Sequence, residues 1–113
     1  MTNWLDIAAD AQIKPGTNLF ETEAGRVLIC RRGDELYASS NACPHAMLPL
    51  DGGELRGCVL TCPFHGYAFD LRDGRNIDMP DDPPLKVFPL RRIGGRVEVA
   101  IDSPVPQRPQ SPG

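Results

Sequence analysis

The sequence predicts an all-β protein, arranged as a small sandwich or open barrel, and three observations support this prediction. Short apolar runs alternate with polar residues at a period of two rather than at the helical period. Twelve prolines and eleven glycines punctuate the 113 residues and leave no long helical pattern. Turn residues separate neighbouring β-rich runs at short intervals, which is typical of antiparallel strands joined by hairpins.

The amino-terminal half contains a predicted first strand and a hairpin. Trp4 is expected to pack against the core or the base of the sheet as part of that first strand. Residues 26–31 and 35–39 are β-rich runs joined by a Gly-Asp turn at 32–34, which predicts a hairpin. The doublets Arg31-Arg32 and Arg91-Arg92 flank apolar runs and are interpreted as solvated strand ends.

A second hairpin is predicted near the carboxyl end, where residues 86–91 and 96–101 are joined by a Gly-Gly turn at 93–95. Pro89 indicates an edge position, because proline cannot donate to a strand ladder. In the last strand one face is expected to be buried and the other mostly solvated. The buried set is Val97, Val99 and Ile101, and the outer set is Arg96, Glu98 and Ala100.

Both histidines of the chain fall into one pattern with two of its four cysteines. Cys43-Pro44-His45 is separated by sixteen residues from Cys62-Pro63-Phe64-His65. Residues 57–61 and 67–70 are predicted strands that flank the second of these loops. Two thiolates and two imidazoles on paired short loops make a candidate four-ligand metal site. Cys30 and Cys58 lie in apolar runs and are interpreted as buried free thiols.

The spacing C-x-H, a long gap and C-x-x-H resembles that of the Rieske family, in which two Cys hold one iron of a 2Fe–2S cluster and two His hold the other. Gly66 and the run 69–74 are similar to the segment after the second ligand loop of Rieske ferredoxins. The resemblance implies one cluster per chain and no catalytic residues. It also implies that Cys43 and Cys62 bind the inner, permanently ferric iron. His45 and His65 would then bind the outer iron, which accepts the electron.

The resemblance also implies a domain organisation. A single Rieske domain is expected at 1–102, with a cluster-binding insert of two ligand loops at about 41–71. The proline-rich loop at 79–84 is expected either to be a rigid connector or, as in the family, to lean against the cluster. Residues 103–113 are rich in proline and poor in apolar residues, so we expect a disordered tail.

Four positions around the ligands predict a low-potential cluster. High-potential Rieske proteins carry an extra Cys in each loop, and Leu48 and Phe64 stand at those positions here, so no disulfide can brace the loops. High-potential proteins also carry Ser and Tyr hydroxyls, and Tyr67 and Phe69 stand at those positions here. Phe69 cannot donate a hydrogen bond, and fewer donors to sulfur stabilise the added electron less.

The family resemblance implies a one-electron carrier between an NAD(P)H-dependent flavoprotein reductase and the terminal Rieske oxygenase of an aromatic-ring-hydroxylating system. It is not expected to be the enzyme itself, since an oxygenase needs a mononuclear iron with two further His and a carboxylate. The alternatives are the small Rieske subunit of a nitrite-reductase-like complex and a structural zinc module. Zinc sites usually pair Cys with Cys, whereas each loop here mixes Cys with His.

Composition argues against two classes of partner. The net charge of −3 and the lack of a basic stripe argue against nucleic-acid binding. No run approaches the ~18 apolar residues of a membrane span, and no signal peptide is recognisable, so a soluble, cytoplasmic protein is expected. It is also expected to be a monomer. A redox partner is expected to dock over the ligand loops, on apolar side chains with acidic steering groups around them. The apolar set is Met47, Leu48, Phe64 and Pro83, and the acidic set is Asp51, Asp81 and Asp82.

Overall fold

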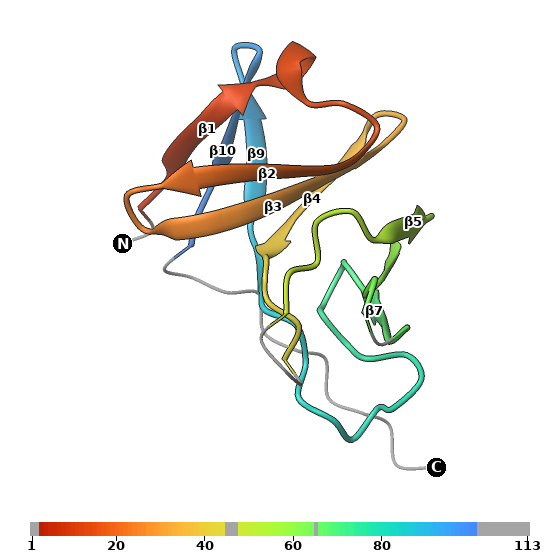
Figure 1. Ribbon diagram of the computed structural model, residues 1–113. Helices are drawn as coiled ribbons and strands as arrows, with labels where there is room; N and C mark the ends of the chain where they lie inside the picture. The colour runs from red at the N-terminus through yellow and green to blue at the C-terminus, as the bar shows by residue number, and fades with distance from the viewer. Residues whose placement is uncertain (1–2, 45–47, 65, 102–113) are drawn as a thin grey trace.

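The computed structural model describes residues 3–44, 48–64 and 66–101, which form three antiparallel sheets (Figure 1). The first sheet has the order β1 (Leu5–Ala9), β10 (Arg96–Val99), β9 (Leu90–Ile93). The second has the order β2 (Gly16–Thr22), β3 (Gly25–Arg32), β4 (Glu35–Ser40), β8 (Val87–Phe88). The third has the order β5 (Glu54–Arg56), β6 (Val59–Thr61), β7 (Ala68–Asp70). Within the described residues the helical structure is one 3₁₀ turn, η1 (Asp10–Gln12), so the all-β prediction is confirmed.

Two apolar clusters hold the sheets together, and β3 contributes to both. The first and second sheets enclose one cluster, made of Ile13, Val27, Ile29, Ala38, Phe88, Val97 and Val99. The other face of β3 carries Leu28 and Cys30, which pack with residues of the third sheet and its loops. Because successive side chains of a strand point to opposite faces, β3 is buried on both sides and reads as a continuous apolar run.

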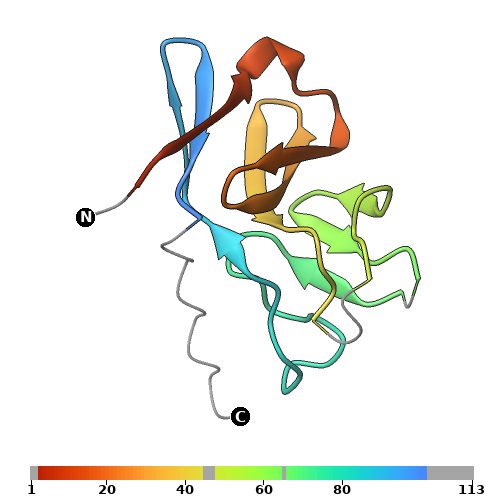
Figure 2. The ribbon, with the colours of Figure 1, turned by 60° about the vertical axis from the view of Figure 1, so that its left-hand side comes forward.

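The first and second sheets together form what we call the base. The third sheet and its flanking loops form a separate layer beside it. Figures 1 and 2 show β5 to β7 on one side of that base. This sheet spans 54–70 and falls inside the insert predicted at about 41–71. The domain end at 102 and the tail at 103–113 stay predictions, because residues 102–113 lie outside the described part of the chain.

The first predicted hairpin is confirmed by β3 and β4, whereas the second differs from its prediction. The strand expected at 86–91 is divided at Pro89 into β8, which pairs with β4, and β9, which pairs with β10. Both are edge strands, as the proline predicted. Ala100 was expected on the solvated face but is buried, because β10 has ended and its N–H donates to the Pro89 carbonyl at 3.0 Å. The strands β2 and β5 were not predicted.

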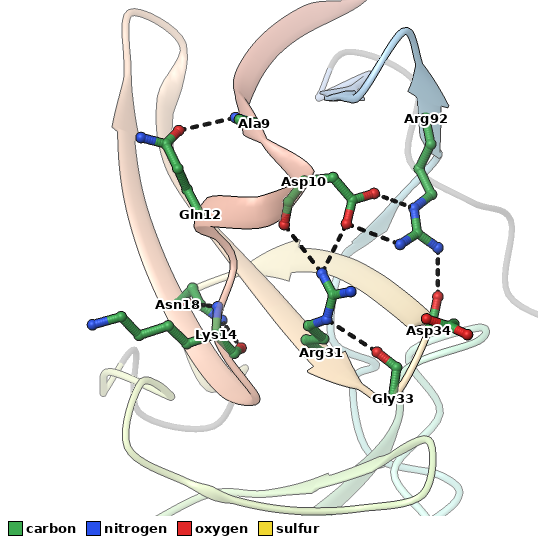
Figure 3. A network of polar contacts seen from close by, with 9 residues as sticks. All are labelled: Ala9, Asp10, Gln12, Lys14, Asn18, Arg31, Gly33, Asp34 and Arg92. Atoms are coloured by element: carbon green, nitrogen blue, oxygen red, sulfur yellow. Dashed lines mark hydrogen bonds and ion pairs between the residues drawn. The ribbon is translucent and has the colours of Figure 1, made fainter.

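Three of the four arginines in the two doublets are exposed, as expected, and Arg31 is half-buried, but several of these side chains also make specific contacts. Arg31 donates from one terminal nitrogen to Asp10 Oδ1 at 2.8 Å, and Arg92 donates from Nε to Asp10 Oδ2 at 2.5 Å (Figure 3). Arg92 also donates to the Asp34 carbonyl at 2.5 Å, and Arg91 lies 4.4 Å from the ring centroid of the half-buried Trp4. Asp10 therefore ties β3 of the second sheet to β9 of the first.

Asp10→Asn is expected to lower the melting temperature at pH 7. Hydrogen bonds from Arg92 and Arg31 hold the pKa of the Asp10 carboxyl well below its usual range. A depressed folded-state pKa stabilises the fold above the unfolded-state pKa of about 3.9, and this contribution is lost as pH falls through the folded-state pKa. Thermal unfolding followed by circular dichroism should therefore show wild type and variant converging below about pH 4. Asp6→Asn, which breaks the more exposed pair with Arg96, is the control. An equal decrease in melting temperature in both variants at pH 7 would show that the contacts of Asp10 with Arg31 and Arg92 do not stabilise the fold.

Candidate metal centre

The two cysteines of the predicted ligand set lie buried in one apolar cluster. Cys43 and Cys62 are 0% and 1% exposed. We call this cluster the thiol compartment; its buried members are Leu28, Cys30, Cys43, Leu50, Leu60, Cys62, Phe69, Leu71 and Leu85. His45 and His65 lie outside the described residues, as does Met47. The structure thus brings together the thiol half of the predicted site.

The first ligand loop is closed by a side chain that the sequence analysis did not single out. Asn41 Oδ1 accepts hydrogen bonds from the amides of Leu50 and Asp51 at 3.1 and 2.8 Å, and its Nδ2 donates to Asp51 Oδ1 at 2.8 Å. Within the loop, the Cys43 amide donates to the Leu48 carbonyl at 2.8 Å. An Asn placed just before a loop is a recognisable signal for this kind of side-chain-to-backbone bond.

The second ligand loop connects β6 to β7 through a tight turn. The Cys62 amide donates to the Tyr67 carbonyl at 2.7 Å, and the Gly66 amide donates to the Cys62 carbonyl at 3.0 Å. Gly66 has a φ of 74°, in the left-handed region that glycine adopts without the steric cost of a Cβ. The predicted strands on either side of this loop are confirmed, although β6 begins at Val59, two residues later than expected.

The segment after β7 is held by a buried carboxylate. Asp70 is 3% exposed and accepts from Arg72 Nε at 3.0 Å and from a terminal guanidinium nitrogen at 2.7 Å. These bonds lower the pKa of Asp70 to about 2, so the carboxylate is ionised at neutral pH. Its main-chain carbonyl accepts from the Gly74 amide at 2.6 Å. The run 69–74 therefore acts as a structural turn that contributes Phe69 and Leu71 to the thiol compartment.

The other two thiols differ in their surroundings. Cys30 belongs to the thiol compartment, and burial raises its pKa to about 12, so it stays protonated. Cys58 was also expected to be buried but is only partly so, because it sits in the turn before β6 rather than in a strand. None of the four cysteines forms a disulfide, in agreement with the expectation for Cys30 and Cys58.

The thiol compartment fits iron–sulfur ligation by the chemistry of its donors. Thiolate sulfur is a soft ligand suited to iron–sulfur clusters, and a thiolate in apolar surroundings needs a cation to offset the cost of burying its charge. The described residues hold no cluster of three or more His, Cys, Asp or Glu that could bind a metal, which is expected when two of the four predicted ligands lie outside them. The same part of the chain has no helix long and apolar enough to span a bilayer.

Phe69 is fully buried in the thiol compartment and carries no hydroxyl, so we expect it to keep the reduction potential of a bound cluster low. We expect a midpoint potential toward the lower end of the range of about −150 to +300 mV found for Rieske centres. Phe69→Tyr should raise it if the added hydroxyl donates to a ligand sulfur, and Phe88→Tyr, in the cluster of the base, should leave it unchanged. Protein-film voltammetry near pH 7 measures both, and a wild-type value well above zero would contradict the argument.

Comparison with known proteins bears on the identity of this site. The family model for the Rieske [2Fe-2S] domain matches residues 3–89. Ferredoxin CarAc of Metapseudomonas resinovorans is 36% identical over 99 residues, which cover 86% of this chain and 92% of the relative. The ferredoxin component of a naphthalene 1,2-dioxygenase system from Pseudomonas aeruginosa is 32% identical over 99 residues, covering 87% of this chain and 95% of the relative.

Solved structures show the same relationship. The ferredoxin in a complex of reduced oxygenase and oxidised ferredoxin of carbazole 1,9a-dioxygenase superposes with a TM-score of 0.78 at 29% identity, covering 97% of this chain and all of the other. A protein described as the small subunit of an NADH-dependent nitrite reductase from Mycobacterium tuberculosis superposes with a TM-score of 0.76 at 26% identity, covering 88% of this chain and 95% of the other.

Proposed function

The chain belongs to the Rieske [2Fe-2S] family, and we propose that it is the ferredoxin component of a ring-hydroxylating dioxygenase system. In this role it receives single electrons from an NAD(P)H-dependent flavoprotein reductase and delivers them to a terminal Rieske oxygenase, while catalysis takes place on the oxygenase. The relatives named as ferredoxin components of dioxygenase systems support this role. The observation that carries it is the pair of thiols, Cys43 and Cys62, that two separate loops bury in one apolar compartment.

Within this proposal each residue has a defined task. Cys43 and Cys62 hold the inner iron of a Rieske-type 2Fe–2S cluster, and His45 and His65 hold the outer one. The bound cluster supplies a one-electron acceptor whose potential exceeds that of a four-cysteine cluster, because two neutral imidazoles replace two anionic thiolates. The apolar side chains of the thiol compartment exclude water from the thiolates, and Asn41 keeps the first loop closed around Cys43.

The proposed docking surface lies at the ligand-loop end of the molecule. Phe64, beside the second ligand, is 61% exposed, and Met79 on the proline-rich loop is 47% exposed, although sequence analysis did not select Met79. Pro83 is exposed as expected, whereas Leu48 is only partly exposed. Among the acidic groups expected to steer a partner, Asp51 and Asp81 are exposed and Asp82 is partly so. An apolar centre with charged surroundings is the usual anatomy of such an interface.

Phe64→Glu is expected to slow electron transfer to the oxygenase by about tenfold or more, since it places an unpaired charge at the centre of the apolar contact. Stopped-flow mixing of the reduced protein with the oxidised oxygenase of carbazole 1,9a-dioxygenase, followed by visible absorption, measures the rate. Ile93→Glu is the matched control, because Ile93 is 51% exposed on β9 of the base.

Two results would count against this proposal. Equal rates in the Phe64 and Ile93 variants would place the contact elsewhere than at the ligand-loop end. Failure of the wild-type protein to reduce ring-hydroxylating oxygenases, together with reduction by a nitrite-reductase flavoprotein, would assign the chain to the nitrite-reductase-like alternative instead.

A further inference from the structure

Asn76 presents a buried hydrogen-bond donor with no acceptor among the described residues. Its side chain is 0% exposed. Its Oδ1 accepts from the amides of Asp78 and Met79 at 3.0 and 2.9 Å, so the acceptor half of the amide shapes the start of the proline-rich loop. Its Nδ2 has no partner in that part of the chain. A buried amide donor left unpaired is destabilising, and such atoms are rare in folded proteins.

The strand register places this amide on the face that carries the thiols. Asn76 forms an antiparallel bridge with Phe69, and Phe69 pairs in turn with Leu60 on β6. Hydrogen bonds lie on either side of the bridge, from the Ile77 amide to the Ala68 carbonyl at 2.8 Å and from the Asp70 amide to the Arg75 carbonyl at 2.9 Å. Directly opposed residues of antiparallel strands share one face, and their side chains approach most closely at such a non-hydrogen-bonded pair.

That face is the wall of the thiol compartment. Leu60 and Phe69 are both fully buried members of it, together with Cys43 and Cys62. Its buried side chains are those of Leu, Phe and Cys, which offer no oxygen acceptor to an amide. A trapped water would need two or more polar partners, which leucine and phenylalanine side chains cannot supply. No described residue supplies the acceptor, whether through a cysteine sulfur, a backbone carbonyl or a tyrosine hydroxyl, which leaves the sulfides of the group that the two thiols would bind.

We propose that Asn76 Nδ2 donates a hydrogen bond to an inorganic sulfide of the bound cluster and thereby raises its reduction potential. A donor to sulfur stabilises the added negative charge, so Asn76 supplies from the opposite strand what Phe69 cannot supply. The inference rests on the ligation proposed above. It makes Asn76 a residue that tunes the cluster as well as one that shapes a loop.

The test labels the asparagine side-chain amides with ¹⁵N and records hyperfine sublevel correlation spectra of the reduced protein. A ¹⁵N coupling is expected in the wild type and in Asn18→Ser, whose site lies on β2 of the base, and it should be lost in Asn76→Leu. The midpoint potential should fall in Asn76→Leu and stay unchanged in Asn18→Ser. The wild-type spectrum needs no variant, so the test stands even where Asn76→Leu does not fold.

Absence of the coupling in the wild type, its persistence in Asn76→Leu, or an unchanged potential in that variant would each overturn the inference. These outcomes leave the Rieske signal and its histidine nitrogen couplings in place, so the proposed function survives them. Loss of the Rieske signal from the wild type itself would instead overturn the proposed ligation on which the inference rests.

Discussion

His65→Ala is expected to abolish the Rieske electron paramagnetic resonance signal of the reduced protein, and His45→Ala is expected to do the same. The chain has two histidines, both at Rieske spacing from a buried cysteine, so no spare imidazole can replace a lost ligand. The outer iron would be left with a single protein ligand. Because binding of a metal group is coupled to folding in small domains, the variants should also lose thermal stability.

Two matched variants separate ligation from general damage to the loops. Phe64→Ala alters an exposed neighbour of His65 and should keep the signal. Cys62→Ser should lose it, whereas Cys58→Ser, at the partly buried cysteine before β6, should keep it. A normal signal in His65→Ala would show that the ligand assignment is wrong. Visible absorption of the purified wild type tests the zinc alternative at the same time, because a zinc site is colourless.

Gly74→Ala is expected to destabilise the protein by about 3 kcal/mol or more, since it combines overpacking with backbone strain. A Cβ at position 74 would lie 1.9 Å from the Leu85 carbonyl oxygen. Moving the backbone to relieve this clash would be energetically costly, because Leu85 is buried in the thiol compartment. The two residues are already in contact, with the Leu85 amide donating to the Gly74 carbonyl at 2.8 Å. The φ of 83° adds strain for any residue with a side chain.

Gly95→Ala is the control for this prediction, because its φ of 78° is similar and an added Cβ would meet nothing within 4 Å. It should cost about 1 kcal/mol, the strain of the left-handed conformation alone. Thermal unfolding followed by circular dichroism compares the two variants, and cluster absorbance reports whether the thiol compartment survives. If Gly74→Ala melts no earlier than Gly95→Ala, the close approach of Gly74 to Leu85 is not a constraint on this fold.

Local patterns were sufficient for part of the fold. The hairpin of β3 and β4 was predicted from its Gly-Asp turn and the β-rich runs on either side. Such a hairpin is predictable because its two strands are neighbours in the sequence and pair with each other. The strands around the second ligand loop were also predicted, because short β-rich runs flank the motif. The strand β2 was missed because it mixes half-buried and exposed positions without clear alternation, and β5 because it has only three residues.

Longer-range arrangements were not accessible from these patterns. The contacts of Asp10 with Arg31 and Arg92 join residues up to 82 positions apart. The sequence around Asp10 does not indicate which distant arginines will pair with it. The strand expected at 86–91 is divided at Pro89 because its two halves pair with different strands: β8 pairs with β4, and β9 pairs with β10. Pairings of this kind are decided by packing between sheets rather than by the sequence of either strand.

By itself, the sequence determined that the chain carries a Rieske-type centre and predicted its ligands, because the motif residues and their spacing are local properties of two short loops. Only the tertiary structure decided which other groups face the thiols. Asn76 lies seven residues after Phe69, and a continuous strand of period two would place two such residues on opposite faces. The turn after β7 reverses the chain and pairs them directly, so both lie on the face of the thiol compartment. The face taken by a side chain is set by strand register, which depends on how the turn folds back against its neighbour.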